Sequence, residues 1–148
     1  MSEVLELPVK KLSDAAVVPE SAYEGDAGID LRSLVNITLQ PFERALVPTG
    51  LALAIPEGYA GFVLPRSGSA IKQGLSLVNA PGLIDSGYRG ELACICINLD
   101  AHNPIEIQVG DRIAQLVVMK VEQLKLFEVD ELSETSRGAG GFGSSGLQ

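Results

Sequence analysis

Short apolar runs separated by turn residues make up most of the chain. Runs of this kind, rich in β-branched residues and bounded by Pro, Gly, Asn and Asp, predict strands. The predicted strands are Ile37–Leu39, Arg44–Val47, Leu51–Ile55, Gly61–Leu64, Leu75–Val78, Leu92–Leu99, Ile105–Val109, Ile113–Val121 and Leu124–Val129. Only Ser69–Gln73, which ends at Gly74, has the pattern of a helical turn. This spacing predicts an all-β sandwich or barrel.

The composition changes near the C-terminus. Residues 135–148 read TSRGAGGFGSSGLQ, and a segment this rich in glycine cannot build a core. We therefore divide the chain into a β domain, residues 1–134, and a C-terminal tail, residues 135–148, that is flexible when free. A plain flexible tail is one interpretation. The other is a flap that orders over an anionic, aromatic ligand, because the tail holds Arg137, Phe142 and a pair of serines.

Charge and cysteine content exclude several function classes. The net charge of −8 argues against a nonspecific nucleic-acid binder, although a few Arg and N–H groups suffice for one small phosphorylated ligand. Cys94 and Cys96 share one strand face within an apolar run and are predicted to be buried. Two cysteines and one His fit neither a disulfide framework nor a zinc site. No apolar run reaches transmembrane length and the N-terminus is unlike a signal peptide, so we expect a cytoplasmic protein without membrane contact.

Three segments carry polar side chains beside predicted strands. In Asp26–Leu31, two carboxylates flank a turn of small residues. Pro65–Gly68 reads PRSG and offers a guanidinium, a hydroxyl and an open backbone N–H, which are donors that suit a phosphate. Gly110–Leu116 leads from a turn into a buried strand, where Gln115 is a candidate phosphate contact and Arg112 is expected in a structural ion pair.

A further segment, Asn79–Glu91, lies between the second and third of these along the chain and reads NAPGLIDSGYRGE. Its Pro and Gly residues predict turns, and Asp85 and Tyr88 are expected to project from a β-hairpin between them. Backbone N–H and C=O groups of such a hairpin can imitate the edge of a paired base. The Asn79 amide adds a further donor and acceptor.

Together with the tail segment Arg137–Gly146, these segments resemble, in order and spacing, the five motifs of the trimeric dUTPase family. The resemblance runs from about Ala22 to Gly146. It implies a β jelly roll that forms a homotrimer, with each active site built from three chains. One subunit supplies the motifs in Asp26–Leu31, Pro65–Gly68 and Gly110–Leu116, which are the first, second and fourth along the chain. A neighbour supplies the third motif, in Asn79–Glu91, and the remaining subunit supplies the tail. The implied reaction converts dUTP and water to dUMP and pyrophosphate, which limits uracil incorporation into DNA and supplies dUMP for dTMP synthesis.

The same resemblance implies the chemical roles. Asp85 is the general base for the water that attacks the α-phosphorus, and Asp30 supports the water or metal network. Ser67 lies near the oxygen that bridges the α- and β-phosphates, and Gln115 assists on the α-phosphate side. No side chain ligates Mg²⁺ directly, because phosphate oxygens and waters hold it, with Asp30 in contact through water.

Substrate recognition is likewise implied by the resemblance. Asn79 and backbone near Leu83 and Ile84 read uracil, Tyr88 packs on the sugar and excludes a 2′-hydroxyl, and Phe142 stacks over the base. The full set of implied substrate contacts is Arg66, Ser67, Gly68, Asn79, Gly82, Leu83, Ile84, Asp85, Tyr88, Ala93, Gln115, Arg137, Phe142, Gly143, Ser144 and Ser145.

Alternatives and departures remain open from the sequence. Asp26 is expected to be structural, and His102 lies too far from the motifs along the chain to be the base. The family usually has Leu where this chain has Ser69, and some relatives carry a longer side chain at Ala93. A dCTP deaminase, or a bifunctional deaminase-diphosphatase, shares the fold but uses Glu in place of Asp85. A catalytically silent nucleotide sensor or binding module is the third possibility.

Overall fold

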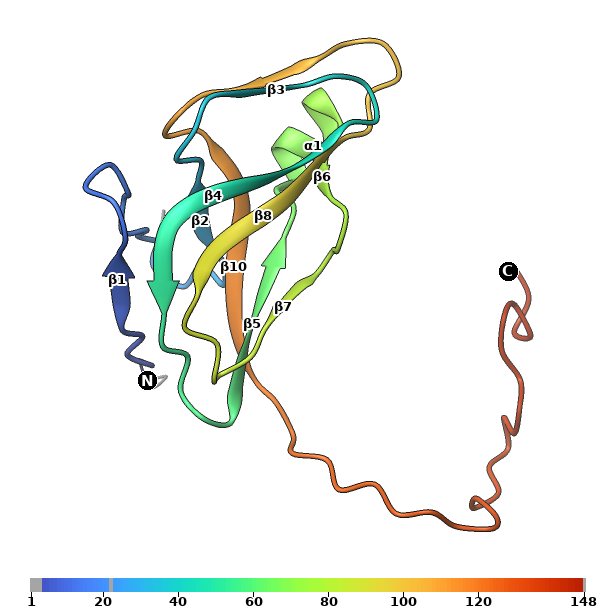
Figure 1. Cartoon of the computed structure of the whole chain (residues 1–148). Coiled ribbons are helices and arrows are strands. Elements are labelled where there is room, and N and C mark those ends of the chain that lie inside the picture. Colours follow the sequence, from blue (N-terminus) through green and yellow to red (C-terminus); the bar gives the residue numbers. More distant parts are fainter. Residues whose placement is uncertain (1–3, 22, 148) are drawn as a thin grey trace.

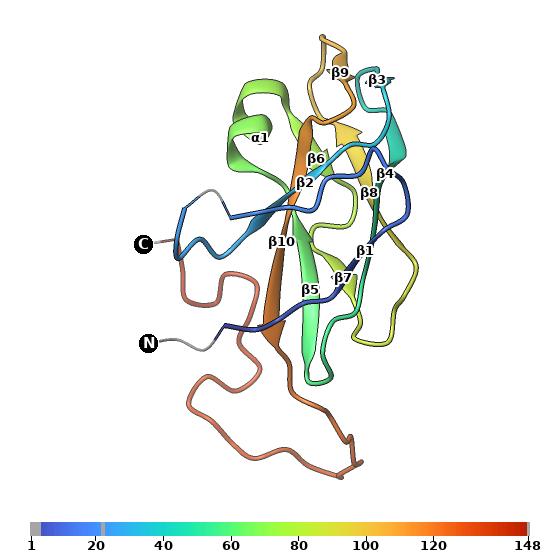
Figure 2. The ribbon, with the colours of Figure 1, turned by 90° about the vertical axis from the view of Figure 1, so that its left-hand side faces the viewer.

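Two four-stranded antiparallel sheets face each other in the computed structural model, which describes residues 4–21 and 23–147 (Figure 1). The first sheet has the order β1 (Val9–Lys11), β4 (Arg44–Leu53), β8 (Glu91–Asn98), β6 (Leu75–Leu77). The second has the order β2 (Ile29–Arg32), β10 (Arg112–Lys120), β5 (Tyr59–Leu64), β7 (Gly82–Ile84). The short pair β3 (Ile37–Leu39) and β9 (Ile105–Ile107) lies at one end of the molecule with the helix α1 (Ser67–Gln73) (Figure 2). The predicted all-β sandwich is confirmed.

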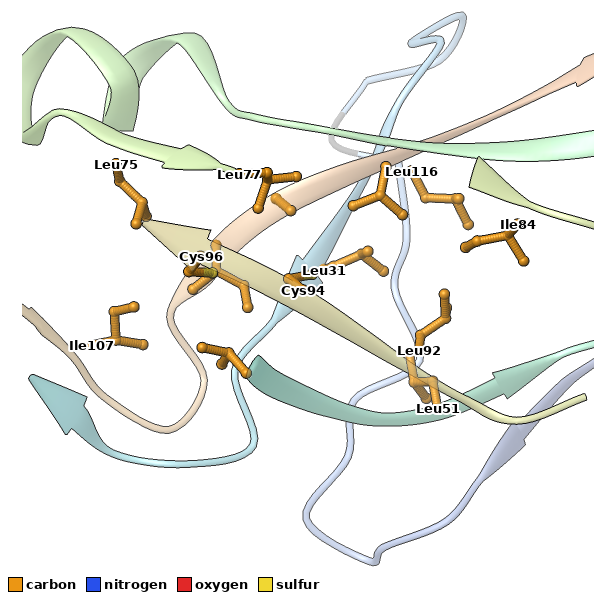
Figure 3. Packing of buried hydrophobic residues seen from close by; sticks show 14 of the residues in the cluster. Leu31, Leu51, Leu75, Leu77, Ile84, Leu92, Cys94, Cys96, Ile107 and Leu116 are labelled. Atoms are coloured by element: carbon orange, nitrogen blue, oxygen red, sulfur yellow. The ribbon is translucent and has the colours of Figure 1, made fainter. Parts of the chain in front are cut away.

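The core fills the space between the sheets. Along β8, buried and partly buried residues alternate, as expected for a strand with one face on the core. Leu92 and Cys96 point inward from this strand and meet Leu31 and Leu116 of the second sheet in one apolar cluster (Figure 3). Cys94 and Cys96 are free and 2% and 0% exposed, so the prediction that both are core residues is confirmed.

The strand β4 is one irregular element where the sequence predicted two. Its register with β8 shifts between Pro48 and Ala52, because Pro48 has no N–H to donate and Gly50 adopts a φ of 73°. Side chains replace part of the lost ladder. The Thr49 hydroxyl donates to the Leu92 carbonyl over 2.7 Å, and the Gly50 N–H donates to Glu91 Oε2 over 3.1 Å.

Other predicted boundaries also change. Leu124–Val129 is not a strand, and its apolar side chains Leu124, Leu126 and Phe127 are 81–90% exposed. The helix begins at Ser67 rather than Ser69 and ends, as predicted, at Gly74 with a left-handed φ of 73°. No helix in the described part of the chain has the length and apolar character needed to cross a bilayer. Ala22, where the family resemblance begins, lies outside the described residues. So do residues 1–3 of the predicted β domain and residue 148 of the predicted tail.

Candidate active site

Neighbouring strands of the second sheet bring three of the predicted segments together. Gln115 of β10 pairs with Asp30 of β2 on one side and with Leu64 of β5 on the other. Pro65 and Arg66 follow Leu64 directly, so the donor segment starts beside these polar residues. Asp30 lies on β2, a strand that the sequence pattern did not predict, and its pairing with β10 fixes the position of this residue.

Asp30 holds two guanidinium groups. Its Oδ1 accepts a hydrogen bond from Arg66 Nε over 3.1 Å, and its Oδ2 accepts one from Arg112 Nη1 over 3.4 Å. The expected structural ion pair of Arg112 is therefore present. Arg66 Nη1 also lies 3.4 Å from Ser69 Oγ, so the Ser that departs from the family pattern contacts this group. We call Asp30, Arg66, Arg112 and Gln115 the Asp30 cluster.

Gln115 is fixed on both sides. Its Nε2 donates to the Pro65 carbonyl over 2.9 Å, and a Cβ added at Gly28 would lie only 2.7 Å from its Oε1. Gly28 thus lets the first segment approach Gln115. Gly28 and Gln115 line a hollow of about 360 Å³ together with Asp26, Ala27 and Asp30. Asp26 Oδ2 accepts the Tyr23 N–H over 3.0 Å and closes a local turn, in accord with the structural role expected for it.

The start of α1 presents further donors beside the Asp30 cluster. Ser67 and Gly68 form the first turn of the helix directly after Arg66, and both are exposed. Backbone N–H groups of a first helical turn have no partner within the helix. This end of the sheet can therefore offer a guanidinium, a hydroxyl and backbone N–H groups to an anionic ligand.

A second hollow, of about 420 Å³, lies between the two sheets on the β7 and β8 side, and we call it the β7–β8 pocket. Its volume falls within the range of small-molecule sites. The predicted residues on its wall are Asn79, Gly82, Leu83, Ile84, Asp85, Tyr88 and Ala93. Its remaining wall, which sequence reasoning missed, is Leu46, Val63, Leu77, Glu91, Leu92, Cys94 and Ile95. Strand alternation marks several of these as core residues, and no local signal marks them as pocket walls.

The segment before and after Asp85 is not a β-hairpin. β7 pairs with β5 in the second sheet, whereas β8 pairs with β4 and β6 in the first. The residues Asp85–Gly90, which we call the β7–β8 loop, therefore cross from one sheet to the other. The hairpin prediction was wrong because turn residues give the reversal but not the strand partner.

Contacts within the β7–β8 loop hold its shape. The Tyr88 N–H donates to the Asp85 carbonyl over 3.1 Å, and the Tyr88 hydroxyl donates to the Glu91 carbonyl over 2.9 Å. Arg89 Nη1 donates to the Ser86 and Tyr88 carbonyls over 2.6 and 3.1 Å. Asp85 is exposed and lines the β7–β8 pocket together with Tyr88.

Within one chain, the Asp85 carboxylate and the Asp30 cluster lie apart. Asp85 follows Ile84, which pairs with Gly61 near the start of β5, whereas Arg66 follows the end of that strand. Five residues of extended chain from Gly61 to Arg66 span about 17 Å. The chain thus carries two partial sites at opposite ends of β5.

The tail joins neither partial site. From residue 121 the chain leaves the sandwich and runs outside it without strand or helix up to residue 147 (Figure 1). Arg137 Nε donates to the Gly140 carbonyl over 2.7 Å, a contact within the tail. The predicted tail contacts Arg137, Phe142, Gly143, Ser144 and Ser145 are all exposed and line neither hollow described above.

Cys94, which lines the β7–β8 pocket, is not a nucleophile at neutral pH. Burial raises the pKa of Cys94 to about 12, and the neighbouring Cys96 adds to this shift. Burial likewise raises the pKa of Cys96 to about 12. Both thiols therefore stay protonated at neutral pH, and nucleophilic chemistry needs the thiolate.

Comparison with known proteins agrees with these features. The family model described as dUTPase matches residues 14–146. The chain belongs to the dUTPase family. It is 52% identical over 146 residues to the deoxyuridine 5′-triphosphate nucleotidohydrolase of Nocardia farcinica, with 99% of this chain and 88% of the relative covered. It is 55% identical over 145 residues to that of a Mycobacterium species (strain JLS), with 95% and 94% covered.

Solved dUTPases share the fold. The Staphylococcus bacteriophage 80alpha dUTPase with dUpNHpp is 34% identical, with a TM-score of 0.90 over 97% of this chain and 100% of that chain. A variant dUTPase of phage phi11 of S. aureus is 30% identical, with a TM-score of 0.82 over 88% of this chain and 100% of that chain, and coordinates a structural Mg(II) ion. The family resemblance read from the sequence is therefore confirmed.

Proposed function

We propose that this protein hydrolyses dUTP to dUMP and pyrophosphate. The observation that carries the proposal is that Asn79, Asp85 and Tyr88 line one pocket in a chain of the dUTPase family. Relatives named deoxyuridine 5′-triphosphate nucleotidohydrolase, at 50–55% identity, support the same activity. The activity would limit uracil incorporation into DNA and supply dUMP for dTMP synthesis.

Uracil would bind in the β7–β8 pocket. The Asn79 amide packs over Gly82, since a Cβ added at Gly82 would lie 3.4 Å from Asn79 Nδ2. That amide and the backbone of Leu83 and Ile84 would pair with the polar edge of the base. Ala93 would contribute only backbone or van der Waals contact. Tyr88 would pack on the deoxyribose and leave no room for a 2′-hydroxyl.

Asp85 would act as the general base. The carboxylate takes a proton from a water while the water oxygen bonds to the α-phosphorus, and the bond from that phosphorus to the bridging oxygen breaks. Pyrophosphate leaves with the charge that grows on the bridging oxygen. Ser67 would donate to that oxygen, and Gln115 would bind on the α-phosphate side.

The remaining phosphate contacts would come from Arg66, Gly68 and the tail. Asp30 aligns the Arg66 guanidinium, so the fork is oriented before a ligand binds. Arg137 would bind the outer phosphates, with Gly143, Ser144 and Ser145 as further donors. Phe142, which is fully exposed, would stack over the base and close the site.

Mg²⁺ fits this site as a metal held by the substrate. In residues 4–21 and 23–147, no three His, Cys, Asp or Glu side chains gather as a ligand set. Both Asp30 oxygens already accept hydrogen bonds from guanidinium groups, so a contact of Asp30 with the ion would run through water. The bound ion would offset the charge of the triphosphate.

A homotrimer would unite the two partial sites. Asp85 and Arg66 lie at opposite ends of β5, so one chain does not bring the base to its own phosphate donors. The exposed apolar side chains after β10 support burial against another subunit. They are Leu124, Leu126, Phe127 and Leu132. A cytoplasmic location, and the absence of nucleic-acid and membrane partners, stay predictions from the sequence.

Steady-state assays with dUTP, dCTP, dTTP and UTP in the presence of Mg²⁺ test the proposal. We expect pyrophosphate release with the highest kcat/KM for dUTP and no ammonia from dCTP. Ammonia from dCTP would indicate a deaminase or a bifunctional enzyme. No pyrophosphate from dUTP would favour the nucleotide sensor instead.

A further inference from the structure

The ring of Tyr88 occupies the space that a side chain at position 90 would need. A Cβ added at Gly90 would lie 2.6 Å from Tyr88 Cζ and 2.9 Å from Cε1, and would also meet the hydroxyl oxygen. Carbon atoms pack at about 3.5–4.0 Å, so any side chain at position 90 must displace the ring by about 1 Å. Glycine at this position leaves the space that the ring occupies.

The backbone itself does not demand glycine at position 90. Gly90 is not among the residues with positive φ, and the three nearest atoms that an added Cβ would meet outside the adjoining residues all belong to Tyr88. Gly87, in the same loop, also lacks a positive φ, and an added Cβ there would meet nothing within 4 Å. An added side chain would thus meet the Tyr88 ring at position 90 and open space at position 87.

A second contact holds the ring from its polar end. The Tyr88 hydroxyl donates to the Glu91 carbonyl over 2.9 Å, and the Glu91 carboxylate accepts the Gly50 N–H over 3.1 Å. The acceptor of the ring is thus tied to the irregular part of β4. Tyr88 lines the β7–β8 pocket, whereas Gly90 is not among the lining residues.

We propose that Gly90 is a positioning residue for substrate specificity, because the absence of a side chain there sets where Tyr88 meets the sugar. The inference rests on the proposed function, in which Tyr88 excludes the 2′-hydroxyl of UTP. A methyl group at position 90 moves the ring from the place in which it packs on deoxyribose. The enzyme then loses part of its preference for dUTP over UTP.

The test measures kcat/KM for dUTP and for UTP in each variant and takes their ratio. The ratio does not depend on the folded fraction, so a purely structural defect leaves it unchanged. We expect Gly90→Ala to lower the ratio roughly tenfold, and the matched Gly87→Ala to keep the ratio of the unchanged enzyme. An unaltered ratio in Gly90→Ala overturns the inference, as does an equal fall in Gly87→Ala.

Tyr88→Ala separates this inference from the proposed function. If Tyr88→Ala keeps the full preference for dUTP, the sugar filter itself is wrong and the Gly90 inference falls with it. If Tyr88→Ala lowers the preference and Gly90→Ala does not, only the Gly90 inference fails. In the Tyr88→Ala background, adding Gly90→Ala should leave the ratio unchanged. A further change in the ratio would show that Gly90 acts independently of the ring.

Discussion

The Asp30 cluster and the β7–β8 loop are held in place by different means. Asp30 and Gln115 lie on paired strands, and ion pairs to Asp30 orient Arg66 and Arg112. The β7–β8 loop joins the two sheets and is shaped mainly by contacts among its own residues and with Glu91. The sheet therefore supplies rigid groups suited to phosphates, whereas the loop supplies the proposed base and the sugar filter. We expect changes in the two regions to produce different kinetic signatures.

The largest effect is expected from the proposed base in the loop. Asp85→Asn keeps the shape of the side chain but cannot accept the proton from water. We expect kcat to fall about 10²–10⁴-fold, while the dissociation constant of a non-hydrolysable dUTP analogue changes little. Pyrophosphate release and equilibrium binding measure the two quantities. Normal turnover in this variant would show that another group activates the water.

Truncation after Ser136 removes the groups that we propose to close over both regions. Loss of base stacking by Phe142 alone corresponds to about 1–3 kcal/mol, so we expect kcat/KM to fall roughly ten- to hundredfold. The proposed trimer, measured by light scattering, should stay intact because the tail packs on neither sheet. A truncated chain with full activity would contradict the flap.

A smaller effect is expected from loosening the sheet region. Asp30→Asn leaves Arg66 and Arg112 without their ion-pair partner, and a misplaced guanidinium weakens phosphate binding. We expect kcat/KM for dUTP to fall up to about a hundredfold, with the preference for dUTP over UTP retained because Tyr88 is untouched. Asp26→Asn is the matched control, since Asp26 closes a turn through one exposed hydrogen bond. An equal loss in the control would argue that the segment matters only for folding.

The smallest effect concerns the thiols behind the β7–β8 pocket. Because burial raises the pKa of Cys94 and Cys96 to about 12, the native protein holds almost no thiolate below about pH 10. Iodoacetamide at pH 8 should therefore leave activity and mass unchanged, and should label both thiols after denaturation. Labelling of the native protein with loss of activity would mean that the buried thiols become accessible to the reagent in the folded protein.

Strand periodicity predicted seven of the ten strands in the described residues and missed the short strands β1, β2 and β7. β3 was predicted with its observed bounds, and β8 within one residue at each end. Leu124–Val129 has the same kind of pattern but finds no sheet edge within its own chain, and a strand is stable only with a partner. Pro48 suggested a break in β4, yet Thr49 and the Glu91 side chain carry the chain across the irregularity.

The sequence by itself determined the residue types of the site and their order along the chain, because chemistry and turn formation depend on local residues. It also determined that both cysteines are buried, because alternation places them on one face. Only the tertiary structure decided that β7 pairs with β5 rather than with β8. It also decided that Asp30 serves two arginines, and that Asp85 and Arg66 lie at opposite ends of one strand. Strand order and register depend on contacts between residues far apart in the chain, which no local pattern specifies.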